Sequence, residues 1–383
     1  MSSFLPDENY MRRAIELALK GGGKAHPNPM VGAVLVKDGR VLGEGFHREY
    51  GNLHAEREAL RDAQSRGEDV RGSTLYVTLE PCCHWGKQPP CTDAIIEAGI
   101  AVVVAGSSDP NPLVDGKGFA ALKEAGVLVV QDFLKQECDE VNEVFFHYIA
   151  TGKPFVALKY AQTADGKAAL STGASRWITT HSSRDFVHVL RGTFSCVMCG
   201  IGTVLADDPL LTCRVQGEGL KQPVRALLDC SLRLPAESKL VKTAHEVETL
   251  VFTDKSDHPS KERKRRFLEA AGVRVIEVAA DEGKLDLEEI LEHLGKIGID
   301  SVLVEGGPKI NSSFLFWGGE KKQLARRIYC FVAPKIFGGK AGQVQSPVQG
   351  QECDTILECV KLSTPKVKLF DEDVLLEYKV LGL

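Results

Sequence analysis

Strand-like and helix-like segments alternate along the chain, and this alternation limits the possible folds more than any other feature. In the first half, the strand-like runs STLYVTLE and AVVVAG are each followed by a helical pattern, CTDAIIEAG and GFAALKEAG. Strands that alternate with helices form parallel sheets through right-handed crossovers, and the helices cover the faces of the sheet. Ligands of such sheets lie beyond the carboxyl ends of the strands. We therefore predict an α/β fold with its sites at strand ends.

The chain divides into two predicted domains, because 383 residues exceed the usual size of one. Residues 9–20 are spaced as in a helix, and residues 31–47 predict a hairpin about an Asp-Gly turn. A charged helix over residues 135–150 then meets Thr-Gly-Lys-Pro, where a helix cannot continue. The alternation starts again at FVALKYAQ and runs to VLLEYKVL. We place the domains at 1–150 and 151–383.

Charge and hydropathy exclude several functional classes. A formal charge of −5 argues against bulk binding to nucleic acid, and no apolar stretch of eighteen residues predicts a membrane span. The basic run at 261–266, KERKRR, leads into FLEAAG and is predicted to be the solvated face of a helix. Eleven cysteines, an odd number scattered through strand-like runs, indicate reduced thiols. We therefore expect a cytoplasmic protein.

The stretch EPCCHWGKQPPC, residues 80–91, combines three cysteines with a histidine and predicts a metal site. Zinc favours nitrogen and thiolate ligands, and a catalytic zinc keeps a fourth position for water. His54 would supply the nitrogen, and Glu56 would carry protons during a hydrolytic deamination. This combination follows the zinc deaminase signature, H-x-E and then P-C-x-x-C. The departure is that eight residues, instead of two, separate Cys82 from Cys91.

The long gap leaves the choice of ligands open among Cys82, Cys83, His84 and Cys91. Cys82 follows a proline at a strand end, and Cys91 begins a helix whose dipole favours a thiolate, so we predict these two with His54. Residues two apart in a regular helix point to different sides, so His54 and Glu56 must lie at an irregular first turn. The alternative is a closed structural zinc with four of these side chains as ligands, which has no need of Glu56.

Four segments carry a resemblance to a known family: HPNPMVGAV (26–34), GEGFH (43–47), HAE and EPCCHWGKQPPC. In this order they resemble the deaminase half of the bifunctional riboflavin biosynthesis deaminase–reductases, in which a serine commonly stands at Cys83. The resemblance implies a cytidine-deaminase-like three-layer domain, with Zn²⁺ on His54, Cys82 and Cys91 and with Glu56 as general acid and base. It also implies that the pocket for a pyrimidine nucleotide is lined by Asn28, His47 and Lys87.

The second half lacks the G-x-G-x-x-G fingerprint of dinucleotide-binding folds. Polar residues stand instead at strand ends, in KYAQTADGKAA, SRW and GIGTVLADDPLLTCR. In VEGGPKINSS, the strand 301–304 stops at Glu305-Gly306-Gly307 before a helix. Glycines at such a junction let a diphosphate approach backbone N–H groups. The C-x-x-C at Cys196 and Cys199 is predicted to be inert, because residues three apart on a strand face opposite ways.

These segments are similar to the reductase half of the same family, whose fold resembles dihydrofolate reductase, so the resemblance covers nearly the whole chain. It implies NADPH contacts at Ala161, Trp177, Thr203, Asp207 and the stretch that begins at Gly307. It implies substrate contacts at Lys159, Ser175, Arg191, Leu211, Arg214 and Glu305. Two arginines suit a phosphorylated substrate, because the guanidinium fork matches phosphate oxygens.

We therefore predict a bifunctional enzyme of riboflavin biosynthesis. It would deaminate a diaminopyrimidine ribosylamino phosphate and then reduce the ribosyl group to ribityl with NADPH. Its partners would be this small phosphorylated pyrimidine and further copies of itself, without nucleic acid or membrane. One alternative is a nucleic-acid base deaminase with an unrelated appendage, which would need a basic groove with stacking aromatics. The other is a catalytically silent zinc-bearing binding protein.

Overall fold

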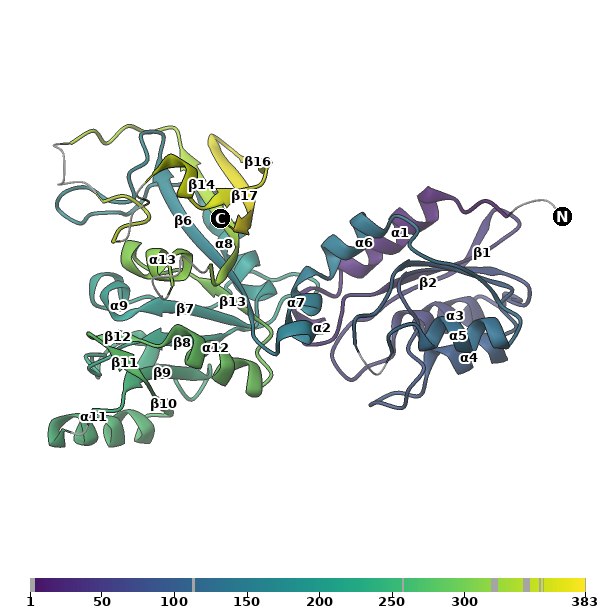
Figure 1. Ribbon diagram of the computed structural model, residues 1–383, viewed down its shortest axis with the longest axis horizontal. Helices are drawn as coiled ribbons and strands as arrows, with labels where there is room; N and C mark the ends of the chain where they lie inside the picture. The colour runs from purple at the N-terminus through teal and green to yellow at the C-terminus, as the bar shows by residue number, and fades with distance from the viewer. Residues whose placement is uncertain are drawn as a thin grey trace. The chain divides into compact units, whose positions relative to one another are not determined.

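The computed structural model describes residues 4–111, 114–256, 258–317, 323–339, 345–350, 353 and 355–382. The chain forms two compact units (Figure 1). The N-terminal unit comprises residues 1–152 with 217–220, and the C-terminal unit comprises residues 153–216 with 221–383. The division at 152/153 lies two residues beyond the boundary predicted from the sequence. Both units are α/β, as the alternation predicts.

The N-terminal unit has a five-stranded sheet of order β2-β1-β3-β4-β5. The strands are β1 (Gly32–Lys37), β2 (Arg40–Phe46), β3 (Thr74–Leu79), β4 (Val102–Ser107) and β5 (Leu128–Val130). β1 and β2 form the predicted hairpin about Asp38-Gly39, and β1 is also antiparallel to β3. Only β3, β4 and β5 are mutually parallel, so the sheet is mixed.

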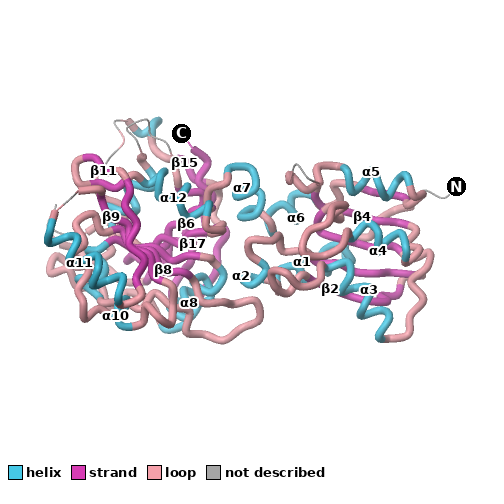
Figure 2. The backbone as a smooth tube through the Cα atoms, turned by 90° about the horizontal axis from the view of Figure 1, so that it is seen from below, coloured by secondary structure: helices cyan, strands magenta, loops and turns pink. Residues whose placement is uncertain are grey.

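Helices cover both faces of this sheet and make three layers (Figures 1 and 2). Alternate residues of β1 divide between two apolar clusters, since Leu35 belongs to one and Val34 and Val36 to the other. The first cluster includes α3, α4 and α5, and the second includes α1 and α6. The helices are α1 (Glu8–Leu19), α2 (Gly22–Ala25), α3 (Ala55–Ser65), α4 (Cys91–Glu97), α5 (Lys117–Glu124), α6 (Lys135–Val141) and α7 (Glu143–Thr151).

The single helix predicted over residues 135–150 is instead two helices, α6 and α7, which are separated at Asn142. The Asn142 side chain donates to Met30 O at 3.0 Å and accepts from Met30 N at 2.8 Å. Asn142 has φ −110° and ψ 19°, outside the helical range. A side chain that pairs with a distant backbone in this way competes with the helical conformation, and local periodicity gives no sign of it.

The C-terminal unit has a ten-stranded sheet of order β10-β9-β8-β7-β13-β6-β14-β17-β15, with β16 paired to β17. The strands from β10 to β14 run parallel, and β17 is antiparallel to β14. They are β6 (Phe155–Thr163), β7 (Cys196–Gly200), β8 (Val224–Leu228), β9 (Thr249–Asp254), β10 (Val273–Val278), β13 (Ser301–Val304), β14 (Ala325–Ala333), β15 (Lys361–Leu362), β16 (Lys366–Phe370) and β17 (Asp373–Gly382). A separate two-stranded sheet pairs β11 (Ala280–Asp281) with β12 (Lys284–Leu285).

One large apolar cluster packs this sheet against α12 and α13. The helices of the unit are α8 (His181–Thr193), α9 (Ile201–Asp207), α10 (Lys239–Lys242), α11 (Pro259–Ala270), α12 (Leu287–Lys296) and α13 (Pro308–Leu315), with a 3₁₀ turn at Ile356–Glu358. The basic run KERKRR lies on α11, where Arg265 pairs with Glu269 and Arg266 with Glu262 on the solvent side. This confirms the predicted solvated helix face.

Candidate active sites

Three potential metal ligands converge at the start of α3 and at the two ends of the loop between β3 and α4. His54 precedes α3 with an extended backbone, φ −74° and ψ 162°. His54 Nδ1 lies 3.4 Å from both Cys82 Sγ and Cys91 Sγ, and the three ligand atoms all lie within 4.8 Å of one another. Zinc bonds of about 2.3 Å to sulfur and about 2.0 Å to nitrogen put tetrahedral ligands roughly 3.6 Å apart. The set therefore fits one zinc ion.

Glu56, the second residue of α3, lies beside these ligands. It is only 3% exposed, and its carboxyl group hydrogen-bonds the Cys91 thiol. Burial raises the pKa of Glu56, and the nearby Cys82 adds to this rise. His54 precedes the first helical residue and has an extended backbone, so its side chain and that of Glu56 can both point to the metal site. This is the irregular first turn that the sequence required.

The two candidate thiols lie close enough to shift each other's pKa. Cys91, together with His54, lowers the pKa of Cys82 to about 4, whereas Cys82 and burial raise the pKa of Cys91. The backbone N–H groups of Cys91 and Thr92 donate to Cys82 O at 3.0 and 3.2 Å, which fixes the loop ends together.

Two of the predicted pyrimidine contacts lie next to the histidine ligand, and the third packs on Tyr50. His47 Nδ1 is 3.0 Å from Leu53 O, which can only accept, so His47 Nε2 accepts from Asn28 Nδ2 at 3.2 Å. Burial lowers the pKa of His47, in keeping with this neutral form. The His47 and His54 rings meet edge to face, with centroids 5.4 Å apart. Lys87 Nζ lies instead 3.8 Å from the ring centre of Tyr50.

Glu80 is an important residue of this site that sequence reasoning missed. Its buried carboxylate accepts from four backbone N–H groups, those of Asp109, Gly116, Gly118 and Phe119, at 3.0 to 3.3 Å. Glu80 stands two residues before Cys82, so it ties the ligand loop to the segment after β4. The signal was present in the sequence as a charged residue at the end of an apolar strand, TLYVTLE.

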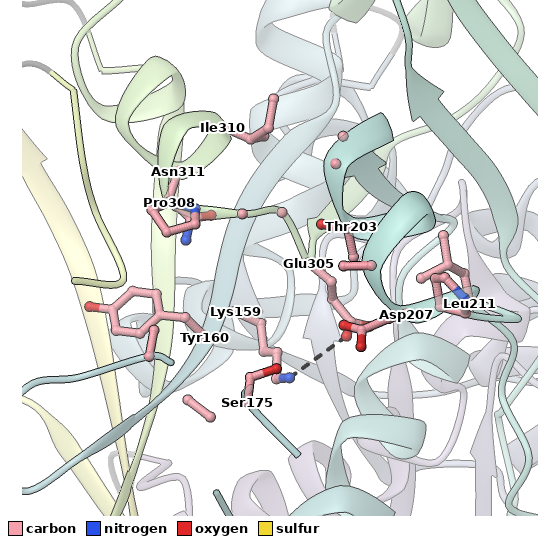
Figure 3. A pocket seen from close by; sticks show the side chains of 18 of the residues that line it. Lys159, Tyr160, Ser175, Thr203, Asp207, Leu211, Glu305, Pro308, Ile310 and Asn311 are labelled. Atoms are coloured by element: carbon pink, nitrogen blue, oxygen red, sulfur yellow. Dashed lines mark ion pairs between the residues drawn. The ribbon is translucent and has the colours of Figure 1, made fainter. Parts of the chain in front are cut away.

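The C-terminal unit contains a cleft of about 1680 Å³ at the carboxyl ends of its central strands (Figure 3). Side chains from β6, α9, α13 and the residue after β13 point into it, among them Lys159, Thr203, Asn311 and Glu305. Every residue predicted for the reductase half lines this cleft: Lys159, Ala161, Ser175, Trp177, Arg191, Thr203, Asp207, Leu211, Arg214, Glu305 and Gly307. The cleft therefore lies at the carboxyl ends of parallel strands, which is where such sheets bind their ligands.

A buried group of charges lies in the wall of the cleft. Arg191 grips Glu305 with two hydrogen bonds, Nε to Oε1 at 2.5 Å and Nη2 to Oε2 at 2.9 Å. Lys159 Nζ lies 3.7 Å from Glu305 Oε2 (Figure 3). Burial alone would raise the pKa of Glu305, but Arg191 and Lys159 outweigh it and lower this pKa to about 2. Because Glu305 occupies the fork of Arg191, Arg214 is the one of the two predicted substrate arginines that forms no ion pair with a described carboxylate.

The segment that carries Trp177 is fixed by cations. Trp177 is 66% exposed, so it is not a core residue, and the Arg184 guanidinium carbon lies 4.4 Å from its ring centre. Lys335 Nζ donates to the carbonyls of Trp177 and Ile178 at 3.1 and 2.6 Å. Arg176 pairs with Asp207 at 3.1 Å. These contacts fix the exposed indole ring of Trp177 in the lining of the cleft.

Glycines shape the part of the cleft between β7 and α13. A Cβ atom added to Gly200 would lie 2.9 Å from Ile310 Cγ1, and one added to Gly306 would lie 2.7 Å from Ile310 Cβ. Gly307 is the residue before α13, so the start of that helix borders the cleft. A Cβ atom added to Gly307 would meet nothing closer than Thr203 Oγ1 at 4.0 Å, and such open backbone beside a helix start suits the diphosphate of a dinucleotide. The residues present therefore fit NADPH.

Some residues that line the cleft were not predicted, because the sequence gives little or no indication of their position. Ser231 and Arg233 follow β8 and line the cleft, but only their place after a strand marked them. His188 also lines the cleft, one helical turn before Arg191 on α8. The spacing of three residues between His188 and Arg191 was the available clue.

Two protein families match the chain. Residues 5–107 match the cytidine and deoxycytidylate deaminase zinc-binding region, and residues 154–376 match the RibD C-terminal domain. The riboflavin biosynthesis protein RibD of Actinobacillus pleuropneumoniae is 46% identical over 99% of this chain and 96% of its own length. The protein of the same name from Aquifex aeolicus is 42% identical over 97% of this chain and 98% of its own.

Solved structures agree with these matches. A diaminohydroxyphosphoribosylaminopyrimidine deaminase/5-amino-6-(5-phosphoribosylamino)uracil reductase from Thermotoga maritima has a TM-score of 0.82 and 41% identity, covering 97% of this chain and 98% of that one. RibD of Acinetobacter baumannii has a TM-score of 0.84 and 34% identity, covering 98% and 99%. The predicted deaminase-like and reductase-like folds are confirmed. The chain belongs to the RibD family of riboflavin biosynthesis, whose members join a zinc-binding deaminase domain to a reductase domain.

Proposed function

We propose that this chain carries out both reactions of its family through the residues described above. The N-terminal unit hydrolyses the exocyclic amine of 2,5-diamino-6-ribosylamino-4(3H)-pyrimidinone 5′-phosphate. The C-terminal unit then reduces the ribosyl chain of the product to ribityl with NADPH. The observation that carries the proposal is the buried carboxylate of Glu56 beside three zinc-ligand atoms within 4.8 Å of one another. A structural zinc would need no such carboxylate.

In the deaminase unit, His54, Cys82 and Cys91 would hold the zinc ion. When bound, zinc supplies a Lewis acid that makes water nucleophilic near neutral pH. Glu56 would accept the proton of that water and deliver it to the leaving nitrogen, so that a C–O bond replaces a C–N bond and ammonia departs. Burial of Glu56 keeps bulk water away from this proton transfer.

Asn28 and His47 would hold the pyrimidine ring against Glu56. Their mutual hydrogen bond fixes the amide and the imidazole, and the edge-to-face contact of His47 with His54 ties both to the ligand set. Lys87 lies in the loop between the cysteines, with its ammonium group over Tyr50. This places a positive charge on the ligand loop, which suits contact with the substrate's phosphate.

In the reductase unit, bound NADPH would supply the hydride that reduces C1 of the opened sugar. Trp177, Thr203, Asp207, Ala161 and the stretch from Gly307 would bind and orient the cofactor. Lys159, held beside Glu305 in the cleft wall, would face the reacting sugar, and Arg191 would keep Glu305 in place. Ser175, Leu211 and Arg214 would contact the remainder of the substrate. The free guanidinium of Arg214 suits its phosphate.

A stepwise assay tests the proposal. The diaminopyrimidine is supplied first without and then with NADPH, and ammonia and NADPH are both recorded. Ammonia release without NADPH, followed by NADPH oxidation, is the expected order. NADPH oxidation with the intact diamino compound would contradict it. Ammonia release from an RNA hairpin alone would instead support the nucleic-acid deaminase, and no release from either would support a silent binding protein.

We further propose that the protein is a cytoplasmic homo-oligomer. All eleven cysteines are free, as in a reducing compartment. None of the helices in the described ranges has the length and apolarity of a membrane span. The β16–β17 hairpin at the sheet edge exposes Val367 and Leu369, which a second copy would cover. Sedimentation analysis should show an oligomer, and a monomer at micromolar concentration would contradict this.

A further inference from the structure

His188 is a titratable residue in the reductase cleft that the chemistry above leaves without a role. It is 8% exposed, lies on α8 and lines the cleft. Its Nδ1 atom lies 3.0 Å from Thr212 O, and the Nη1 atom of Arg191 also approaches that carbonyl, at 3.4 Å. His188 is therefore fixed to the same backbone atom as a residue of the buried charge group.

The hydrogen bond to Thr212 fixes which nitrogen carries the proton. A carbonyl oxygen can only accept, so His188 Nδ1 donates. Burial lowers the pKa of His188, and the positive charges of Arg191 and Arg214 lower it further, against weaker opposite effects of Thr212 and Glu305. The ring is therefore neutral, and Nε2 has a lone pair that accepts hydrogen bonds. The hydrogen bond that His188 makes with the described residues goes through Nδ1, and none of them donates to Nε2.

An unused acceptor is unusual in this part of the cleft. Both oxygens of Glu305 accept from Arg191, and Lys159 lies beside them. Asp207 is paired with Arg176. The charged groups that surround the substrate region thus offer donors for a phosphate, while their carboxylates are already occupied. A sugar chain brings several hydroxyl donors, and each buried donor needs an acceptor.

We propose that His188 Nε2 accepts a hydrogen bond from a hydroxyl group of the substrate's sugar chain and so positions that chain for hydride transfer. His188 is a positioning and specificity residue, and no proton passes through it. The inference rests on the proposed function of the C-terminal unit, since the ribosyl substrate brings these sugar-chain hydroxyls to the cleft.

Two substitutions distinguish the role of His188 Nδ1 from that of His188 Nε2. His188→Asn keeps a donor near Nδ1 for Thr212 and removes the acceptor, whereas His188→Gln keeps an acceptor near Nε2. The deaminated pyrimidine is supplied directly, and NADPH oxidation is followed. We expect His188→Asn to raise KM for the pyrimidine about tenfold, while KM for NADPH stays unchanged. Ammonia release, measured separately with the diaminopyrimidine, should also stay unchanged. His188→Gln should bring KM back to within about threefold of the wild type.

Substrate analogues that each lack one sugar hydroxyl give a readout that a purely structural role would not move. With the wild type, one analogue should bind about tenfold more weakly than the parent compound. With His188→Asn, that same analogue and the parent should bind equally. An unchanged KM in His188→Asn, or an equal loss for every analogue, would overturn the inference.

The wild-type analogue series keeps the inference testable if the variants do not fold, because equal binding of all analogues would also overturn it. Failure of the proposed function gives a different result. In that case the wild type would oxidise no NADPH with the deaminated pyrimidine, before any variant is compared.

Discussion

Glu56 and Glu305 are both almost completely buried, and their surroundings shift the two pKa values in opposite directions. Burial and Cys82 raise the pKa of Glu56. At Glu305, Arg191 and Lys159 outweigh burial and hold the pKa at about 2. A carboxyl group that takes and returns a proton needs a pKa nearer neutrality, whereas a permanent anion needs cationic partners. The two carboxyl groups are thus built for different tasks.

Replacing the carboxyl of Glu56 with an amide should abolish deamination, while the protein should still bind zinc. Glu56→Gln cannot carry a proton, so ammonia release should fall at least a hundredfold. Zinc content, measured by mass spectrometry, should stay at one ion per chain because Glu56 is not a predicted ligand. NADPH oxidation with the deaminated pyrimidine is the control and should be unchanged. Loss of zinc from the variant would show that Glu56 has a structural role instead.

The ion pairs of Glu305 should make the stability of the C-terminal unit depend on pH. A fall in the pKa from 4.5 to about 2 corresponds to about 3 kcal/mol. Because the folded pKa is the lower one, this stabilisation is complete above about pH 4.5 and is lost as the pH falls towards 2. Urea unfolding of the wild type and Glu305→Gln should differ most at pH 7. The difference should shrink below pH 4.5, and a constant difference would contradict this account.

At this scale, the sequence predicts residues that belong to a local pattern better than residues that pair across the chain. His54, Glu56, Cys82 and Cys91 follow a known spacing, and the structure brings them together. The bidentate pairing of Arg191 with Glu305, 114 residues apart in the chain, has no local signal. Arg191 was predicted to bind the phosphate of the substrate with its guanidinium fork. In the structure, that fork binds Glu305 instead. The roles of the individual residues stay predictions until variants are assayed.

Helix α3 carries His54 and Glu56 to the metal site, and it packs directly on the backbone of β2. A Cβ atom added to Gly45 would lie 2.3 Å from Ala59 N and 2.4 Å from Ala55 O. The helix approaches the strand this closely because glycine has no side chain. The position of the ligand set thus depends on a residue that touches no ligand.

Gly45→Ala should therefore push α3 away from the sheet. We expect a loss of about 1–3 kcal/mol in the free energy of unfolding, as for other overpacked cores, and faster loss of zinc to a chelator. Gly86→Ala, in the same unit, is the matched control, because its added Cβ would meet nothing closer than His84 Nε2 at 4.0 Å. Equal stability and equal zinc loss in the two variants would contradict the close-packing argument.

Long elements with clear periodicity were predicted well, including α1, α12 and most strands of both sheets, whereas β16 was not predicted. The structure differs where a distant partner decides the local conformation. Asn142 interrupts a helix because it pairs with Met30, and Glu80 gathers four backbone N–H groups from residues 109 to 119. The short elements β11, β12 and β15 have two residues each, too few for any periodicity to show.

The proposed function combines two reactions in one chain, one on the pyrimidine ring and one on its sugar. Each unit has its own sheet and its own site, so the two chemistries need not share residues. The zinc-ligand atoms all lie in the N-terminal unit, and the cleft is lined only by residues of the C-terminal unit. Removing the metal should therefore stop one activity and spare the other.

Zinc removal followed by a two-substrate assay tests this central claim most directly. The full chain is treated with a chelator, and ammonia and NADPH are measured, first with the diaminopyrimidine and then with the deaminated compound. We expect no ammonia and no NADPH oxidation with the first substrate, full NADPH oxidation with the second, and recovery of ammonia release when zinc is returned. Continued ammonia release from zinc-depleted protein would contradict the account.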